Sequence, residues 1–129
     1  MSTPLNFDYL IRLKNAYMAG NKVVTSPSSK YCLALAEILK RHHFIADYSP
    51  MSDDPKTLQT TLSYSNARPA ISGLTLLSKP GRRLYSKSSS IPWGKTKNSL
   101  IIISTSSGLM SQREAVTKKL GGELVAEIN

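Results

Sequence analysis

Apolar side chains recur at three- and four-residue intervals in two stretches of the first half of the chain, a spacing typical of helices. The first predicted helix spans Asn6–Ala19, with Asn6 as its N-cap and Gly20 as its stop. The second spans about Ser29–His42. The apolar positions are Phe7, Leu10, Ile11, Leu13 and Tyr17 in the first, and Cys32, Leu35, Ala36 and Leu39 in the second.

Between and after these helices the pattern favours strands. Lys22–Thr25 and Phe44–Tyr48 are short, and Thr57–Tyr64 alternates apolar and polar residues as a half-buried strand does. The polar stretch Asn66–Pro69 then interrupts the pattern. We therefore expect an amino-terminal module of residues 1–66, in the order helix, strand, helix, strand, strand, and a second module of residues 67–129.

The second module begins with a predicted hairpin. Ala70–Leu77 reads as one strand, Ser78–Gly81 as a turn with Pro and Gly where turns favour them, and Arg82–Tyr85 as the returning partner strand. The hairpin tip then presents two guanidinium groups, which bind phosphates or stack on bases. Tyr85 is either a ring for stacking on RNA or a core ring beneath the hairpin, and the sequence leaves both open.

The apolar, β-branched run Leu100–Ile103 predicts a buried strand that passes through Ser104–Ser107 and turns at Gly108. Ser111 and Glu114 form a capping box that opens a short helix, which carries Lys118 and Lys119 in its last turn and stops at Gly121 and Gly122. Glu123–Ile128 is the last predicted strand. The whole pattern is that of an α+β protein whose carboxyl-terminal module is mainly antiparallel β with one short helix.

The hydroxyl groups of Ser104–Ser107 are the first candidate for chemistry. Short donors and acceptors on a rigid turn, together with free backbone N–H groups, suit the grip of sugar and phosphate oxygens. Because Ser and Thr are also ordinary turn residues, a loop without a ligand remains the alternative.

Charge changes the picture. The chain has 129 residues, 17 Lys and Arg against 8 Asp and Glu, and a formal net charge of +9. No acidic residue occurs between Asp54 and Glu114, whereas basic residues recur there. This asymmetry favours a polyanionic partner bound mainly by the second module, with a merely basic surface as the alternative.

Several chemistries find no support. Cys32 lies on the apolar stripe of its helix and suggests a core thiol, and His42 and His43 are adjacent, without companions at metal-ligand spacing. Gly94–Thr96 resembles the tail of a phosphate-binding loop but lacks its earlier glycine and the following helix. We expect no catalytic set, metal site, cofactor or small-molecule substrate. Nor do we expect a membrane span, a secretory signal or an internal disulfide.

The central motif of the chain is Ser104-Thr105-Ser106-x-Gly108-x-Met110-x-x-Arg113-Glu114-Ala115, followed by Gly121-Gly122-Glu123. This motif resembles the signature of the small-subunit ribosomal protein eight family. The resemblance extends over nearly the whole chain, through Ile71–Leu74, Ser78-Lys79-Pro80-Gly81-Arg82-Arg83-x-Tyr85, Ala36–Lys40 and Phe44–Ile45.

This resemblance implies a structural protein of the small ribosomal subunit that binds the central domain of small-subunit rRNA beside neighbouring ribosomal proteins. It places the Ser104–Ser106 turn in a minor groove and the basic hairpin on phosphates. A free translational repressor or RNA chaperone is the alternative function; an enzyme is not expected. The candidate RNA-binding residues are Lys79, Pro80, Gly81, Arg82, Arg83, Tyr85, Ser104, Thr105, Ser106, Ser107, Gly108, Lys118, Gly121, Gly122 and Glu123.

Some positions depart from the family's pattern. Ser107 stands where Lys or Arg is common, Gln112 where an acid is usual, and the chain ends in Ile128 and Asn129 where an aromatic end is usual. Such drift favours a mitochondrial ribosome, with the bacterial cytoplasm or a plastid as alternatives. The start of the chain, Met1–Pro4, shows no long Arg-rich leader, which favours the alternatives.

Overall fold

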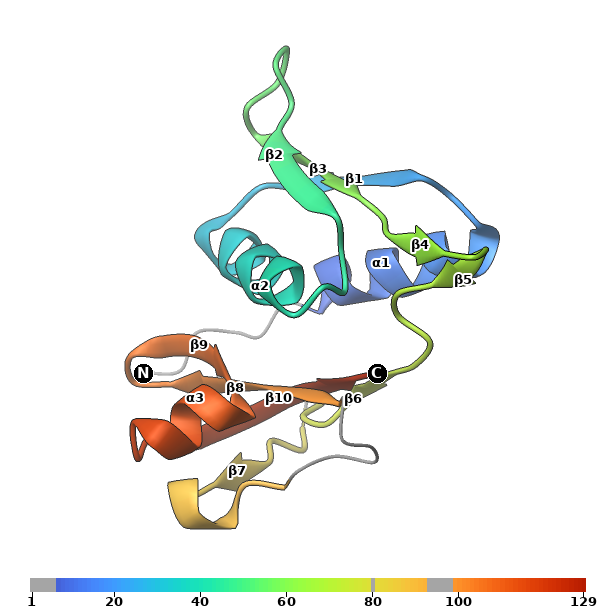
Figure 1. Cartoon of the computed structure of the whole chain (residues 1–129). Helices are drawn as coiled ribbons and strands as arrows, with labels where there is room; N and C mark the ends of the chain where they lie inside the picture. Colours follow the sequence, from blue (N-terminus) through green and yellow to red (C-terminus); the bar gives the residue numbers. More distant parts are fainter. Residues whose placement is uncertain (1–6, 80, 93–98) are drawn as a thin grey trace. The chain divides into compact units, whose positions relative to one another are not determined.

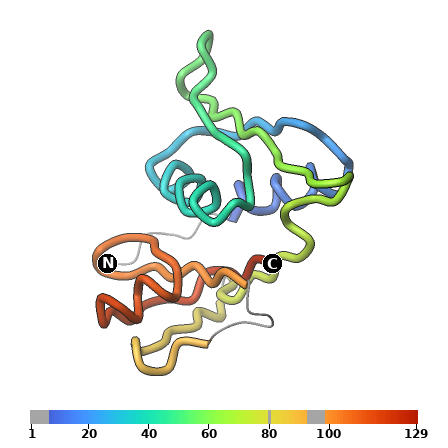
Figure 2. Tube along the Cα trace, in the orientation of Figure 1, coloured from blue at the N-terminus to red at the C-terminus, as the bar shows by residue number. Residues whose placement is uncertain are grey.

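The computed structural model describes residues 7–79, 81–92 and 99–129 (Figures 1 and 2). Its contacts divide the chain into an amino-terminal unit, Met1–Ser72, and a carboxyl-terminal unit, Gly73–Asn129. The expected module boundary after Asn66 lies a few residues earlier and stays a prediction. The predicted N-cap Asn6 and the stretch Gly94–Thr96 lie outside the described residues.

Two helices of the amino-terminal unit form as predicted. Helix α1 spans Asp8–Ala19 and ends at Gly20, whose φ of 74° is the left-handed conformation that glycine adopts most readily. Helix α2 spans Lys30–Arg41 and begins at Ser29, whose hydroxyl accepts a hydrogen bond from the backbone N–H of Cys32 at 3.1 Å.

The strands of this unit are β1 (Val23–Pro27), β2 (Asp47–Pro50) and β3 (Thr57–Thr61), which pair antiparallel in the order β1-β3-β2. The prediction of a strand over Phe44–Tyr48 was wrong in its start. The backbone N–H of Phe44 bonds to the carbonyl of Leu39, so Phe44 closes the end of α2 before β2 begins. Its apolarity reflects burial rather than strand pairing.

Tyrosine hydroxyls bond inside this unit. Tyr9, only 1% exposed, shares a hydrogen bond of 2.8 Å with the hydroxyl of Thr60 on β3. Tyr17 donates to the Phe44 carbonyl at 2.7 Å and accepts from the N–H of Ser63 at 3.0 Å. Burial raises the pKa of Tyr9 to about 12, since its charged form would be desolvated there.

A small hairpin completes the amino-terminal unit. Strands β4 (Tyr64–Ser65) and β5 (Arg68–Pro69) pair across Asn66 and Ala67, which both have positive φ, 53° and 64°. The sequence predicted only a polar break here. Two positive φ angles are what a tight two-residue hairpin turn requires.

The carboxyl-terminal unit is an antiparallel sheet in the order β6-β10-β8-β9, with β7 also paired to β10. The strands are β6 (Leu74–Leu76), β7 (Tyr85–Ser86), β8 (Leu100–Thr105), β9 (Gly108–Ser111) and β10 (Gly122–Ile128). Helix α3 spans Gln112–Thr117, and a 3-10 turn, η1, spans Ser88–Ser90. The hydrophobic core of the carboxyl-terminal unit contains Ile91, Ile101, Ile103, Met110 and Ala115.

This architecture confirms an α+β fold, with two corrections. The predicted hairpin required strands β6 and β7 to pair with each other, and they do not. Both lie along β10 instead, because Leu77 donates to the Val125 carbonyl and Leu124 donates to the Leu84 carbonyl. The edge strand is thus interrupted by residues 78–83, which we call the basic excursion.

The second correction concerns the region after Leu100. The Ser104–Ser107 segment does not lead directly into a helix, because the chain first returns along β8 as β9. The capping box is confirmed, since the Ser111 hydroxyl accepts from the N–H of Glu114 at 3.3 Å. Helix α3 is shorter than expected and ends before Lys119, whose φ is 57°. No helix in the described ranges is both long and apolar enough to span a membrane.

Candidate nucleic-acid interface

The Ser104–Gly108 segment forms the tip of the β8–β9 hairpin, which we call the hydroxyl hairpin. Thr105 pairs with Gly108, so that only Ser106 and Ser107 lie in the turn. Gly108 has a φ of 110° and supplies the unusual backbone conformation, whereas neither turn serine has a positive φ. Both turn serines are exposed, and within the described part of the chain their hydroxyls have no hydrogen-bond partner.

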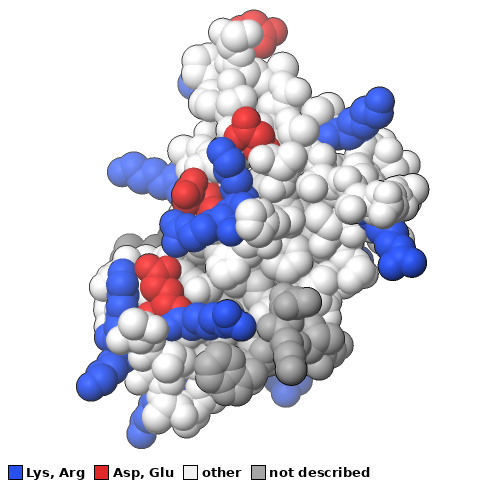
Figure 3. Space-filling view, in the orientation of Figure 1, with Lys and Arg blue, Asp and Glu red and all other residues white. Residues whose placement is uncertain are grey.

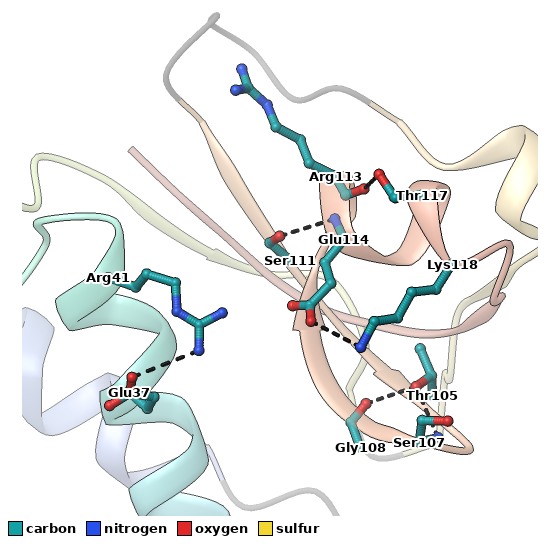
Figure 4. A network of polar contacts seen from close by, with 10 residues as sticks. All are labelled: Glu37, Arg41, Thr105, Ser107, Gly108, Ser111, Arg113, Glu114, Thr117 and Lys118. Carbon is teal, nitrogen blue, oxygen red and sulfur yellow. Dashed lines mark hydrogen bonds and ion pairs between the residues drawn. The ribbon is translucent and has the colours of Figure 1, made fainter.

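Thr105 serves the turn itself. Its hydroxyl donates to the Gly108 carbonyl at 2.8 Å and accepts from the N–H of Ser107 at 3.1 Å (Figure 4). Since these two bonds hold the hairpin tip closed, Thr105 has less hydrogen-bonding capacity to offer a ligand than its neighbours. The sequence predicted that the four hydroxyl groups lie together, but it did not show that the Thr105 hydroxyl supports the turn while the others do not.

Ser104 belongs to a row that crosses the sheet. Ser104 pairs with Glu123 on β10, and Glu123 pairs with Tyr85 on β7. Directly paired residues point to the same face of a sheet, so these three side chains share one face. Tyr85 is 65% exposed, which excludes the alternative that its ring lies in the core beneath a hairpin. The next row, with Ile103 and Met110, packs in the core against α3.

Arg83 is held on this face by Glu123. One guanidinium nitrogen, Nη1, donates to both carboxylate oxygens at 3.1 Å, and the side chains are 32% and 7% exposed respectively. Arg83 is therefore not the unpaired cation that the sequence suggested. The ion pair uses only Nη1, so the other N–H groups of the guanidinium are available to a ligand while Glu123 fixes the position of the side chain.

The basic excursion is a tight loop at the sheet edge. Lys79 and Arg82 exchange backbone hydrogen bonds of 2.9 Å, and Gly81 between them has a φ of 82°. The side chains of Lys79 and Arg82 are exposed and unpaired within the described residues. Pro80, also a predicted interface residue, lies outside those residues.

Sequence reasoning missed the residue that closes this loop. Ser78 is fully buried; its hydroxyl accepts from the N–H of Leu84 at 2.9 Å and donates to the carbonyl of Leu84 at 3.4 Å. These bonds hold the two ends of the excursion together. The available signal was a serine shortly before a Pro-Gly turn. The role of that serine follows only from the structure, which shows that the edge strand is interrupted and that Ser78 joins the two ends of the interruption.

Gly121 and Gly122 lie where β10 enters between its neighbours. A Cβ on Gly121 would stand 2.5 Å from the Ser86 carbonyl oxygen, and one on Gly122 would collide with the Ser104 carbonyl oxygen. The two glycines thus permit the close strand approach that sets Ser104, Glu123 and Tyr85 side by side. Whether they also contact RNA stays a prediction.

The remaining predicted residue, Lys118, caps α3 and pairs with Glu114 at 3.2 Å (Figure 4). Lys and Arg outnumber Asp and Glu on the face of the molecule drawn in Figure 3. Among the described residues, no cluster of His, Cys, Asp or Glu is suited to hold a metal ion. The surface of the carboxyl-terminal sheet thus combines exposed cations, hydroxyls and a tyrosine ring.

Together these features define the class: an α+β protein of two units with a basic, hydroxyl-bearing surface on its carboxyl-terminal sheet. The family model "Ribosomal protein S8" matches residues 5–129 of the chain. The chain belongs to this ribosomal protein family.

Individual relatives agree with the family match over almost all of the chain. The small ribosomal subunit protein uS8 of Opitutus terrae is 43% identical over 130 residues, covering 99% of both chains. The protein of the same name from Chloroflexus aggregans is 43% identical over 124 residues, covering 94% of this chain and 93% of the relative. That of Bifidobacterium longum is 43% identical over 121 residues, or 92% of each chain.

Proposed function

We propose that this protein is a structural constituent of the small ribosomal subunit, where it binds small-subunit rRNA and stabilises its fold. Membership of the ribosomal protein S8 family and relatives named as small-subunit proteins support this function. Neighbouring ribosomal proteins are the other expected partners. In such a role the protein performs no chemistry, which fits a surface of hydrogen-bonding groups and cations.

The observation that carries the proposal is the row Tyr85, Glu123 and Ser104, with Arg83 fixed beside it. RNA presents 2′-hydroxyls and base edges in a wide minor groove and phosphates on both sides of it. Ser104 and Ser106 offer short groups for the groove, and Tyr85 offers a ring and a hydroxyl. The basic excursion lies at the same edge as Tyr85 and supplies Lys79 and Arg82 for phosphates.

The two kinds of contact divide the work. Cations attract any RNA from a distance, whereas a hydroxyl bonds only when the RNA has the matching shape. We infer that the basic excursion provides grip and the hydroxyl hairpin provides recognition. Glu123 fits this division as the group that positions Arg83, and Gly121, Gly122 and Thr105 as the backbone that positions Ser104.

The relatives support a different compartment from the one that the chain's departures suggested. The compared relatives are bacterial, which favours a bacterial cytoplasmic ribosome over the mitochondrial one that the departures suggested. Ser107, which stands where the family commonly has Lys or Arg, means one cation fewer at the hairpin tip and does not distinguish the two compartments.

Sedimentation tests the proposal directly. Tagged protein expressed in bacteria should sediment with small ribosomal subunits in a sucrose gradient at moderate salt. The top of the gradient, where free proteins remain, should contain no RNA-binding activity of the tagged protein. Binding to a small-subunit rRNA fragment should weaken with salt at a log–log slope of roughly −3 to −5, for about four to six phosphate contacts. A protein that binds the fragment but never enters the subunit would instead be a free repressor or RNA chaperone.

A further inference from the structure

The amino-terminal unit contains a cavity that the proposed interface does not use. Its volume is about 720 Å³, within the range of small-ligand sites. The turn that follows α2 forms one wall through His43 and Phe44, and the β4–β5 hairpin forms another through Asn66, Arg68 and Pro69. Figure 1 shows both elements.

The walls combine the groups that a nucleotide needs. Arg68 is exposed and unpaired within the described residues, and the cavity lining contains no Asp or Glu that would repel a phosphate. Phe44 and Pro69 supply apolar surface for a base or sugar. Asn66 supplies an amide, which can both donate to and accept from a base edge.

The backbone around the cavity is unusually constrained. Three of the four non-glycine residues with positive φ in the described part of the chain lie in or beside its walls: His43 at 65°, Asn66 at 53° and Ala67 at 64°. The closure of α2 accounts for the angle at His43 and the two-residue hairpin turn for those at Asn66 and Ala67, so local turns fix the backbone of both walls.

Neighbouring contacts hold the hairpin in place. The Tyr64 hydroxyl donates to the Asn21 carbonyl at 2.5 Å, and the Tyr17 and Tyr64 rings meet edge-on at 5.4 Å. Ala70 also donates its backbone N–H to the Ser63 carbonyl at 2.9 Å. The cavity is therefore formed before any ligand arrives, which lowers the entropy cost of binding.

We propose that this cavity accepts one unpaired ribonucleotide of the bound RNA. Arg68 binds its phosphate, the apolar wall contacts its base or sugar, and the Asn66 amide bonds to a base edge. Unpaired bases in loops and bulges are the usual targets of such pockets. The inference rests on RNA being the partner, but it adds a second contact on a different unit from the carboxyl-terminal sheet.

The first test compares two single-cation losses in the full-length protein. Arg68→Ala should weaken binding to the rRNA fragment by about 5- to 30-fold and reduce the salt slope by about one. Lys14→Ala, which removes an exposed cation of the same unit outside the cavity lining, should change affinity by less than about twofold. Equal effects of the two variants would overturn the proposal.

The second test identifies the ligand. Backbone amide NMR signals of residues 43–44 and 63–70 should shift when nucleoside 5′-monophosphates are added, and shift less with inorganic phosphate. Asn66→Gly keeps a residue that tolerates positive φ while deleting the amide, so it should reduce discrimination among the four nucleotides. Identical shifts with nucleotides and with phosphate would mean a phosphate contact alone and would overturn a nucleotide site.

Failure of this inference differs from failure of the proposed function. If the parent protein binds the fragment and Ser104→Ala weakens it, while Arg68→Ala behaves as Lys14→Ala does, only the cavity proposal is wrong. If the parent protein does not bind small-subunit rRNA, both are wrong.

Discussion

The carboxyl-terminal sheet carries two tight turns of similar construction and different chemistry. The basic excursion turns at Gly81 and the hydroxyl hairpin at Gly108, both with positive φ. Each is closed by a hydroxyl group that bonds to backbone: Ser78 at the base of the first and Thr105 near the tip of the second. One turn presents cations, the other short hydroxyls.

The comparison teaches that similar backbone devices support different parts of recognition. Cations can act on flexible side chains, because electrostatic attraction depends weakly on orientation. A hydroxyl has to be placed within hydrogen-bond distance of one group, so its support has to be more exact. The hydroxyl hairpin accordingly continues the buried strand β8, whereas the basic excursion lies between the short edge strands β6 and β7.

Gly122→Ala and Gly121→Ala should have the largest effects, because each added methyl would meet backbone. We expect each to lower the free energy of unfolding by on the order of 3 kcal/mol, from the strain of overpacking. Gly122→Ala should displace β8 and the hydroxyl hairpin, and Gly121→Ala should displace β7. Thermal melts with amide NMR would check this; a wild-type melting temperature in both would contradict the strand geometry.

Ser104→Ala and Ser106→Ala should come next. Losing a hydroxyl that reads the RNA leaves a desolvated RNA group unpaired, at about 1–3 kcal/mol, or roughly a 5- to 100-fold loss of cognate affinity. Affinity for unrelated RNA and the salt slope should stay unchanged. Filter binding on both RNAs, with melting temperature as the control, decides it. If both variants stay folded and bind as the parent does, the hydroxyl hairpin is not the reading element.

Arg82→Ala should weaken cognate and unrelated RNA alike, by a few-fold, and reduce the salt slope by about one. Arg83→Ala should also lower stability, since it leaves the Glu123 carboxylate buried without its partner. Parallel salt titrations and melts of the two variants separate these outcomes. Equal stability of the two proteins would show that Glu123 does not depend on Arg83.

Thr105→Val should have the smallest effect on recognition. It removes the two hydrogen bonds that close the hairpin tip and keeps the shape of the side chain. We expect a stability loss of about 1 kcal/mol and a smaller loss of cognate affinity than for Ser104→Ala. Calorimetry and the same binding assay provide the values; a larger affinity loss than for Ser104→Ala would make Thr105 a direct reader.

Periodicity in the sequence was enough to predict α1, α2 and β3, because each has one buried face of regular spacing. Strand β8 was predicted from a continuous apolar run, which is buried throughout Leu100–Ile103, and α3 from its capping box. The turn of Ser104–Gly108 was located because it follows that apolar run and contains a glycine. Strand β9 was missed because Leu109 and Met110 are too short an apolar run, and its pairing depends on β8.

The interruption of the edge strand was missed for a different reason. Residues on both sides of Ser78–Arg83 pair with β10, 50 to 54 positions further along the chain for β6 and 36 to 38 positions for β7. Local turn signals correctly located the turn but could not show which strand its flanks pair with. The pairing of Arg83 with the buried Glu123 depends on the same long-range register.

The broken edge has a consequence for solubility. An uninterrupted edge strand offers a row of free N–H and C=O groups on which a second molecule can add its own strand, the first step of aggregation. Here β6 and β7 are only three and two residues long, and a charged loop projects between them. An incoming strand would meet Lys79 and Arg82 after a few residues. The loop that we propose to hold RNA thus also protects the free protein from self-association before it is assembled.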